Sequence, residues 1–244
     1  MIYLHIHSHV PDISVAGKQE GMIKGKTRSG LLYECERIIE HCRPKYLLLE
    51  NVKNLVGKKF KLQFDEWLAY LESLGYTSYW KVLNAKNYGV PQNRERVFVV
   101  SILGEHKPYE FPKPIPLDKC IADILEDKVD EKYYINKPFR LVDKGHQAEL
   151  DIKGMDCIKR VYATDKISPS LTTMQGGLRE PKILEYDYRI RKLTPRECFR
   201  LMGMRENDID KIQAAGISNT QQYKMAGNSI VVNVLEAIFK ELFL

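Results

Sequence analysis

Hydrophobic and polar residues follow helix and strand patterns along the first hundred positions of the chain. Residues 30–41 place apolar side chains three and four positions apart, which predicts an amphipathic helix. Residues 46–52 form a nearly continuous apolar run, as expected of a strand buried on both faces. A second helical pattern covers residues 60–75, and two strand patterns cover 77–84 and 96–103. Helices and strands that alternate in this way predict a doubly wound α/β sheet.

The alternation ends near residue 104. Prolines at 108, 112, 114 and 116 interrupt regular structure, and residues 105–188 combine short strand-like pieces with many charges. We interpret residues 105–188 as a small mixed lobe. It separates a partial α/β domain at 1–104 from a C-terminal segment at 189–244 that we expect to pack back on that domain.

The C-terminal segment carries two helix signals. Thr194 suits an N-cap, Pro195 suits the first helical position, and Glu197 completes a capping box. Residues 228–243 predict the last helix, with Asn228 or Ser229 as its N-terminal cap.

Composition narrows the class of protein. The 244 residues are 44% hydrophobic, which is typical of a globular chain. The net charge of +6 fits a polyanionic partner, and it equally fits simple solubility. The five cysteines form no C-x-x-C pair, so we expect reduced thiols, no zinc or other metal, and core packing for Cys35 and Cys42. No apolar run has the length of a membrane span, and we expect a soluble, cytoplasmic protein.

Candidate chemistry begins at the end of the first buried strand. Glu50 and Asn51 stand at the carboxyl end of residues 46–52, where open α/β sheets bind their ligands. A carboxylate there could protonate or hydrogen-bond a ring nitrogen. The alternative is an ordinary carboxylate that faces solvent.

Two further segments combine polar residues in patterns that suit binding. Gln92, Arg94 and Arg96 precede a strand with a spacing of two, which predicts two arginines on one side, facing a phosphate or carboxylate. A charged edge strand is the alternative. Gly227 allows a tight turn before Asn228 and Ser229, and helix capping alone would also explain that segment.

Taken together and in this order, these segments resemble the cytosine-C5 DNA methyltransferase family. The segment at 168–177, SPSLTTMQGG, resembles the end of that family's target recognition region. The resemblance covers residues 12–244. The motifs that carry it are Glu50-Asn51-Val52, Gln92-Asn93-Arg94-Glu95-Arg96, Arg191-Lys192-Leu193-Thr194-Pro195-Arg196-Glu197 and Gly227-Asn228-Ser229.

The resemblance implies a Rossmann-like methyltransferase sheet with a target recognition domain at 105–188. It implies methyl transfer from S-adenosylmethionine to C5 of a cytosine flipped out of double-stranded DNA, as in restriction-modification systems. A cysteine thiolate that adds to C6 activates the base. The residues implied are Glu50, Arg94 and Arg96 for catalysis, Leu31, Asn228 and Ser229 for the cofactor, and Ser14, Lys18, Gln19, Gln92, Thr172 and Thr173 for DNA.

The sequence departs from the family at its start. The family has Pro-Cys-Gln where this chain has His9, Val10 and Pro11, and valine forms no thiolate. The family's Phe-x-Gly-x-Gly segment, which forms much of the cofactor pocket, is not found before Asp12. We therefore expect an N-terminally truncated member, with residues 1–11 read from an out-of-frame or re-initiated start.

Three interpretations follow from this departure. The chain is a methyltransferase fragment that is inactive alone, or a non-catalytic DNA-binding subunit that a companion N-terminal chain completes, or the product of a decayed gene. In the third case we expect the strand at 46–52 to lack a neighbour on one side, or the face under the last helix to be exposed.

Overall fold

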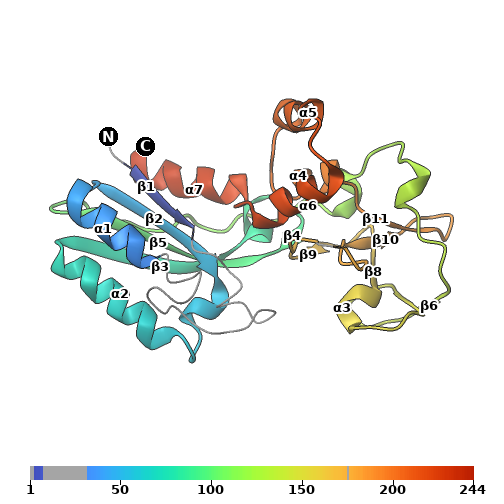
Figure 1. Cartoon of the computed structure of the whole chain (residues 1–244), viewed down its shortest axis with the longest axis horizontal. Helices are drawn as coiled ribbons and strands as arrows, with labels where there is room; N and C mark the ends of the chain where they lie inside the picture. The colour runs from blue at the N-terminus through green and yellow to red at the C-terminus, as the bar shows by residue number, and fades with distance from the viewer. Residues whose placement is uncertain (1–2, 8–31, 175) are drawn as a thin grey trace. The chain divides into compact units, whose positions relative to one another are not determined.

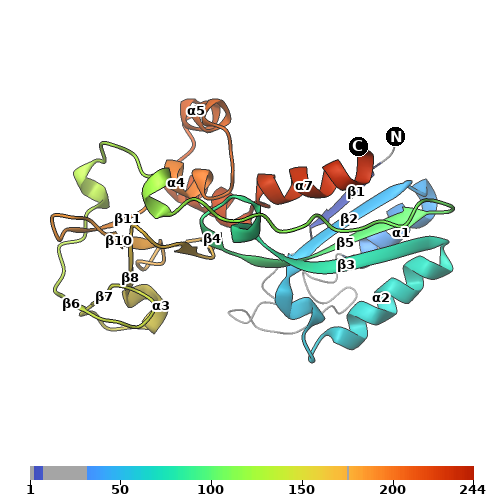
Figure 2. The same cartoon turned by 180° about the vertical axis from the view of Figure 1, so that it is seen from behind.

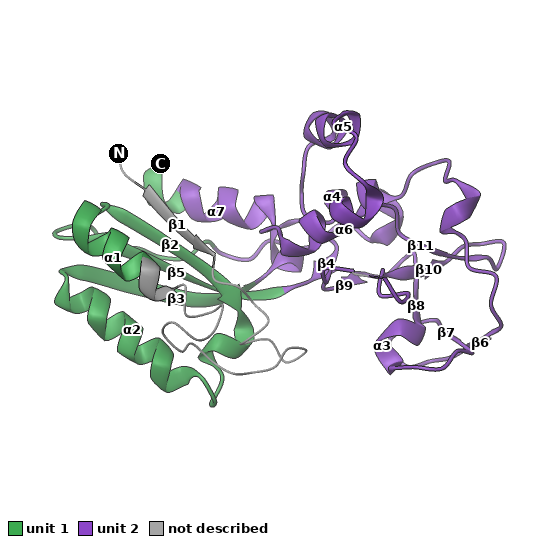
Figure 3. Cartoon of the chain, in the orientation of Figure 1, with its two compact units in different colours: residues 1–83, 95–112, 241–244 green, residues 84–94, 113–240 purple. Residues whose placement is uncertain are grey.

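A computed structural model describes residues 3–7, 32–174 and 176–244. The chain forms two compact units (Figure 3). The first comprises residues 1–83, 95–112 and 241–244, and the second comprises residues 84–94 and 113–240. These units cut the chain at other positions than the three predicted domains, 1–104, 105–188 and 189–244.

The first unit is built on a four-stranded sheet with helices against it, seen from two sides in Figures 1 and 2. The strand order is β1-β2-β5-β3. The sheet is mixed, because β2 runs parallel to β1 and antiparallel to β5. The elements are β1 (Tyr3–His7), α1 (Leu32–Cys42), β2 (Tyr46–Val52), the 3-10 helix η3 (Lys53–Val56), α2 (Lys61–Ser73), β3 (Tyr76–Asn84) and β5 (Glu95–Leu103).

The predicted α/β fold is confirmed, and its helices and strands lie close to their predicted ranges. The unpaired strand, one of the two features expected of a decayed gene, is not what the described residues show. Residues Tyr3–His7 pair in parallel with β2, from Tyr3 opposite Tyr46 to His7 opposite Glu50. The strand at 46–52 therefore has a neighbour on both sides.

Helices α1 and α2 share one face of this sheet. Their buried residues form one core with side chains of β2 and β5. Burial of a large apolar side chain contributes roughly 2 kcal/mol, so this face supplies much of the stability of the unit. Its main members are Ile39, Phe64, Trp67 and Leu71 from the helices and Leu47, Leu49, Val97 and Val99 from the strands. Cys35 packs against this core as predicted, whereas Cys42 is exposed, so the core role predicted for it was wrong.

The second unit contains a five-stranded sheet in the order β11-β10-β8-β7-β6 and a short parallel pair of β4 and β9. Its first elements are η4 (Ala85–Tyr88), β4 (Gln92–Asn93), η5 (Ile121–Ile124), η6 (Glu131–Tyr133), β6 (Phe139–Leu141), β7 (Ala148–Leu150), α3 (Asp156–Lys159) and β8 (Arg160–Ala163). The remaining elements are β9 (Ser168–Pro169), β10 (Lys182–Leu184), β11 (Ile190–Lys192), α4 (Pro195–Arg200), α5 (Glu206–Ala214), α6 (Asn219–Asn228) and α7 (Val232–Phe243).

The start of α4 has the predicted capping box. The Thr194 side chain accepts a hydrogen bond from the Glu197 N–H at 3.2 Å, and the Glu197 carboxylate accepts one from the Thr194 N–H at 2.7 Å. Arg191 binds the same carboxylate through two nitrogens at 2.8 Å each, and its Nε donates to Glu185 at 2.7 Å. Arg191 and Glu197 are fully buried, so this motif fixes how β11 joins α4.

The predicted last helix is divided in two. Helix α6 ends at Asn228, Ser229 is its C-terminal cap, and α7 begins at Val232. The Ser229 hydroxyl donates to the Met225 carbonyl at 2.7 Å, which satisfies a carbonyl in the last turn. The prediction of an N-terminal cap at Asn228 or Ser229 was wrong, because Ser218 begins a helix that the sequence pattern did not indicate. None of the described helices is long and apolar enough to span a membrane.

Candidate functional site

Strands β2 and β5 bring a carboxylate and a guanidinium together. Glu50 lies directly opposite Phe98 in the antiparallel register, and Arg96 is two residues from Phe98. Side chains two positions apart on a strand share a face, so Glu50 and Arg96 are diagonal neighbours on one side of the sheet. That side is opposite the one that carries Leu47 and Leu49.

The two groups form a buried ion pair. Arg96 Nε lies 3.2 Å from Glu50 Oε1, and the side chains are 16% and 1% exposed. Burial lowers the pKa of the Arg96 guanidinium, and the Glu50 charge acts in the opposite direction. The predicted strand-end Glu50 therefore does not face solvent, which excludes the alternative of an ordinary surface carboxylate. A carboxylate held in this way has one edge fixed by the arginine and can present the other to a polar ring.

Asn51 is also fully buried, and it shapes the end of β2. Its side-chain carbonyl accepts a hydrogen bond from the Val52 N–H at 2.7 Å. This contact belongs to the turn from β2 into η3. Asn51 thus fixes the backbone directly after Glu50.

Arg94 binds main-chain carbonyls from two distant segments of the second unit. One terminal nitrogen donates to Leu171 at 2.9 Å, and the other donates to Gly227 and Ser229 at 3.0 Å each. The side chain is 3% exposed. Arg94 stands between β4 and β5, so the predicted run of alternating side chains from 92 to 96 is interrupted there.

Both the nitrogen and the oxygen of the Gln92 side-chain amide form hydrogen bonds inside the protein. Its nitrogen donates to the Leu201 carbonyl at 2.7 Å, and its oxygen accepts from the Leu171 N–H at 3.0 Å. The side chain is fully buried. The residue that we predicted to contact DNA therefore contacts the segment at 168–173 and the end of α4.

Gly227 is helical, so it does not supply the predicted tight turn. A Cβ at this position would overlap the Thr172 carbonyl oxygen and would lie 2.8 Å from the Thr173 nitrogen. A glycine is needed here because helix α6 and the segment at 168–173 approach too closely for any side chain. Sequence reasoning found the glycine and assigned it the wrong reason.

The structure describes some of the remaining predicted site residues, and others lie outside the described part of the chain. Asn228 is exposed and Ser229 is half-buried at the end of α6. Thr172 is exposed, Thr173 is half-buried, and the Thr172 hydroxyl accepts from the Met174 N–H at 3.3 Å. Val10, Ser14, Lys18, Gln19 and Leu31 lie outside the described residues.

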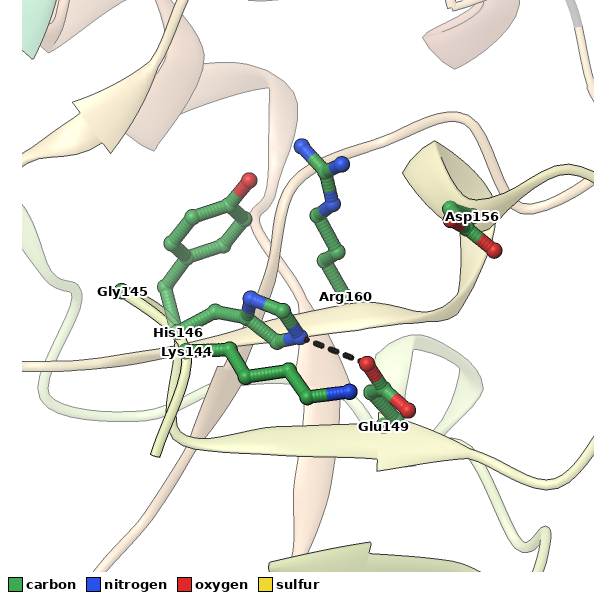
Figure 4. Close-up of a pocket in the computed structure, with 7 residues that line it drawn as sticks. Lys144, Gly145, His146, Glu149, Asp156 and Arg160 are labelled. Carbon is green, nitrogen blue, oxygen red and sulfur yellow. Dashed lines mark hydrogen bonds and ion pairs between the residues drawn. The ribbon is translucent and has the colours of Figure 1, made fainter. Parts of the chain in front are cut away.

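A polar pocket of about 330 Å³ in the second unit was missed by sequence reasoning (Figure 4). It is lined by Lys144, Gly145, His146, Glu149, Asp156, Arg160 and Tyr162. His146 Nε2 lies 3.1 Å from Glu149 Oε1, and Arg140 and Arg160 stand opposite Glu149 on the two neighbouring strands. The Arg140 side chain and the His146 ring lower the pKa of the Glu149 carboxyl. Arg140, Glu149 and Arg160 become neighbours only when β6, β7 and β8 pair, so no local sequence motif predicts this pocket.

Comparison with known proteins places the chain among DNA-modifying enzymes. The family of C-5 cytosine-specific DNA methylases matches residues 11–244. The chain is 46% identical over 233 residues to the type II methyltransferase M2.ScrFI of Lactococcus lactis subsp. cremoris, covering 95% of this chain and 64% of that protein. It is 35% identical to the type II methyltransferase M.Bsp6I of Bacillus sp. strain RFL6, covering 94% of this chain and 75% of that protein.

Solved structures share the fold at lower sequence identity. The S. pombe Dnmt2 methyltransferase aligns with a TM-score of 0.71 at 18% identity, covering 99% of this chain and 78% of that one. A prophage-encoded putative DNA modification methyltransferase of E. coli aligns with a TM-score of 0.67 at 17% identity, covering 100% of this chain and 78% of that one. These likenesses support the Rossmann-like methyltransferase fold.

Proposed function

The chain belongs to the C-5 cytosine-specific DNA methylase family, and from this we propose that it acts in methyl transfer from S-adenosylmethionine to C5 of cytosine in double-stranded DNA. The observation that carries the proposal is the buried pair of Glu50 and Arg96 at the end of a sheet strand. The chain spans 64% of the length of the Lactococcus relative. DNA binding and methyl transfer therefore have to be measured for this chain by itself.

Glu50 and Arg96 suit the recognition of a cytosine ring. The base presents an amino group at C4 and an acceptor nitrogen at N3. Glu50 accepts a hydrogen bond from the amino group and, when protonated, donates one to N3. Arg96 holds the carboxylate in one orientation, so the orientation is fixed before the base enters. This assigns Glu50 the catalytic contact and Arg96 the role of holding both Glu50 and the base.

The end of α6 fits the polar part of the cofactor. Asn228 presents an exposed amide, and the Ser229 hydroxyl donates to Met225 and can still accept a hydrogen bond. We assign both to the cofactor, together with Leu31 from the sequence motif. S-adenosylmethionine, when bound, supplies an electrophilic methyl group.

Gln92 and Arg94 act by positioning the segment that carries Thr172 and Thr173. We revise the DNA contact predicted for Gln92 and the catalytic contact predicted for Arg94, because both side chains are buried and bonded to that segment or to α6. Thr172 and Thr173 keep their proposed DNA contact. The cationic side of the pocket, Lys144 and Arg160, is a second proposed DNA contact, since both side chains belong to residues that are exposed.

A second candidate function is DNA binding without methyl transfer. The observation that favours it is Val10, which stands where the family has its nucleophilic cysteine and supplies no thiolate. A companion chain that carries Phe-x-Gly-x-Gly and Pro-Cys-Gln would instead make this chain one part of a split methyltransferase. Ser14, Lys18 and Gln19 would then close over DNA beside a cysteine of the partner.

One set of assays separates these functions. The purified chain is incubated with duplex DNA and labelled S-adenosylmethionine, alone and after mixing with an N-terminal methyltransferase fragment that carries Phe-x-Gly-x-Gly and Pro-Cys-Gln. We expect DNA binding by the chain alone and methylation only in the mixture. Methylation in the mixture supports a split methyltransferase, whereas binding without methylation in either assay supports DNA binding without methyl transfer. A chain that neither binds duplex DNA nor completes the fragment contradicts both functions.

The variant Glu50→Gln tests the role of the buried Glu50–Arg96 pair in the same mixture of chain and fragment. It keeps the shape of the side chain and removes its charge and its acidic proton. We expect methylation to fall at least about 100-fold, as for the loss of a general acid–base group. Glu95→Gln is the matched control, because Glu95 also pairs with a cation, Lys53, but in an exposed position.

A further inference from the structure

A buried lysine stands at the start of β10, which lies between β11 and β8 in the five-stranded sheet. Lys182 is 1% exposed, although lysine side chains are seldom buried without a charged partner. Its amine donates to the Leu178 carbonyl at 2.7 Å and to the Glu180 carbonyl at 3.0 Å. The side chain therefore folds back and ties the residues just before β10 to the strand.

The residues before β10 that Lys182 binds follow three residues with left-handed backbone angles or belong to them. We call residues 176–180 the tethered turn. Gly176, Gly177 and Leu178 have φ angles of 76°, 66° and 58°, all in the left-handed region. For a non-glycine residue such as Leu178 this conformation persists only where the surroundings fix it. The Leu178 side chain packs against the core of the sheet, and its carbonyl is held by Lys182, so both ends of that residue are fixed.

The tethered turn follows the segment already assigned to DNA. Leu171 is held by Gln92 and Arg94, and Thr172 lies against Gly227. Arg179 is exposed on the turn itself. An exposed arginine on a fixed backbone is suited to a phosphate contact, which sets position on DNA without reading its sequence.

We propose that Lys182 is a positioning residue for DNA binding, because it holds the tethered turn in the conformation in which Arg179 contacts the DNA backbone. The proposal rests on the proposed function, and it adds a residue that none of the family motifs quoted above contains. It also explains why a charged residue occupies the interior of a sheet at all. A neutral side chain of the same length would fill the space without binding the two carbonyls.

The charged groups around the amine are few. Glu180, two residues before Lys182, and the Cys157 thiol on α3 raise the pKa of the amine, and Lys192, opposite Lys182 on β11, lowers it. Burial lowers the pKa of Lys182 to about 8. A lowered pKa means that the charged amine is less favourable in the tethered turn than in water, so the tethered conformation becomes more stable as the pH rises above about 8.

The test compares Lys182→Met with Lys192→Met in amide hydrogen exchange and in binding to duplex DNA. Lys192 is the matched control, because it is the cross-strand partner of Lys182 and pairs with the Glu180 side chain at 3.3 Å instead of with carbonyls. For Lys182→Met we expect exchange in the tethered turn to rise at least about tenfold and the Kd for DNA to rise by a similar factor. Lys192→Met should change each by less than about threefold.

Three results would overturn the proposal. Exchange unchanged in the tethered turn means that there is no tether. Exchange raised equally in β8 and β11 means that Lys182 only supports the sheet. Exchange raised in the turn with an unchanged Kd means that the turn does not meet DNA. A wild-type chain that binds no DNA overturns the proposed function with it, while the exchange data still report the tether by themselves.

Two further measurements keep the proposal testable if Lys182→Met does not fold. In the folded chain with Cys157→Ser, which removes the neighbouring thiol, protection of the tethered turn corrected for intrinsic exchange should rise several-fold between pH 7 and pH 9.5, because the closed turn holds the amine with a lowered pKa. Arg179→Ala, which leaves Lys182 in place, should raise the Kd for duplex DNA at least about tenfold. Protection that stays constant or falls across this pH range, or an unchanged Kd for Arg179→Ala, contradicts the proposal.

Discussion

Gly227 in helix α6 and Thr172 in the segment at 168–173 approach so closely that no Cβ fits between their backbones. Gly227→Ala must push the two segments apart, and Arg94 donates to a carbonyl on each side of that contact. We expect a loss of at least about 2 kcal/mol in the free energy of unfolding, as for other overpacked sites. Urea denaturation measures it. Lys224→Ala, an exposed change on the same helix, should shift stability by less than about 0.5 kcal/mol.

The pair of Glu50 and Arg96 allows a stability prediction that needs no activity. Glu50→Gln leaves the Arg96 guanidinium without a carboxylate in a largely buried site. We expect a loss of roughly 3 kcal/mol, as for one partner removed from a buried ion pair. The control Glu95→Gln breaks an exposed pair and should cost less than about 1 kcal/mol. Equal losses in the two variants would contradict the buried character of the Glu50 pair.

Arg191 and Glu197 join β11 to α4 through two bonds inside the protein. Arg191→Met removes the cation and leaves the Glu197 carboxylate buried, so we expect a loss of about 3–5 kcal/mol. The double change Arg191→Met with Glu197→Leu removes both charges and should be less destabilising than the single change. Denaturation of the three proteins checks this, and a double variant worse than Arg191→Met would show that the Thr194 and Glu126 N–H groups stabilise the buried carboxylate without Arg191.

Local patterns in the sequence predicted what depends on near neighbours. The strand at 46–52, the two helices after it and the capping box at Thr194 all follow from periodicity or from residues three positions apart. The partners of Arg94 could not be predicted in this way, since they stand 77 and 135 positions further along the chain. The role of Gly227 was misread for the same reason, because the residue that requires it belongs to a distant segment.

The polar pocket predicts an effect on DNA binding. Arg160 is an exposed cation that lines this pocket, and Glu149 stands opposite it in the strand register. If its guanidinium contacts a phosphate, Arg160→Ala should weaken binding to all sequences and lower the slope of log Kd against log salt by about 1. If it contacts a base, the salt slope stays and the preference between sequences falls. Lys211→Ala, an exposed change on α5, should alter neither quantity.

The stability of the chain should depend on pH through Lys182. Its pKa is lowered to about 8 in the folded state from an ordinary value near 10.5, so the unfolded state binds more protons between these two values. The contribution of Lys182 to stability is therefore full above about pH 10.5 and is lost as the pH falls to about 8. We expect the unfolding free energy of the wild type, relative to Lys182→Met, to rise by about 3 kcal/mol from pH 8 to pH 10.5. Denaturation at matched pH values measures the difference, in which the groups common to both proteins cancel. A difference that stays constant over this range would show that the pKa of the amine is the same in the folded and unfolded chains, and a difference that falls would show that the folded chain retains the proton more strongly than the unfolded one.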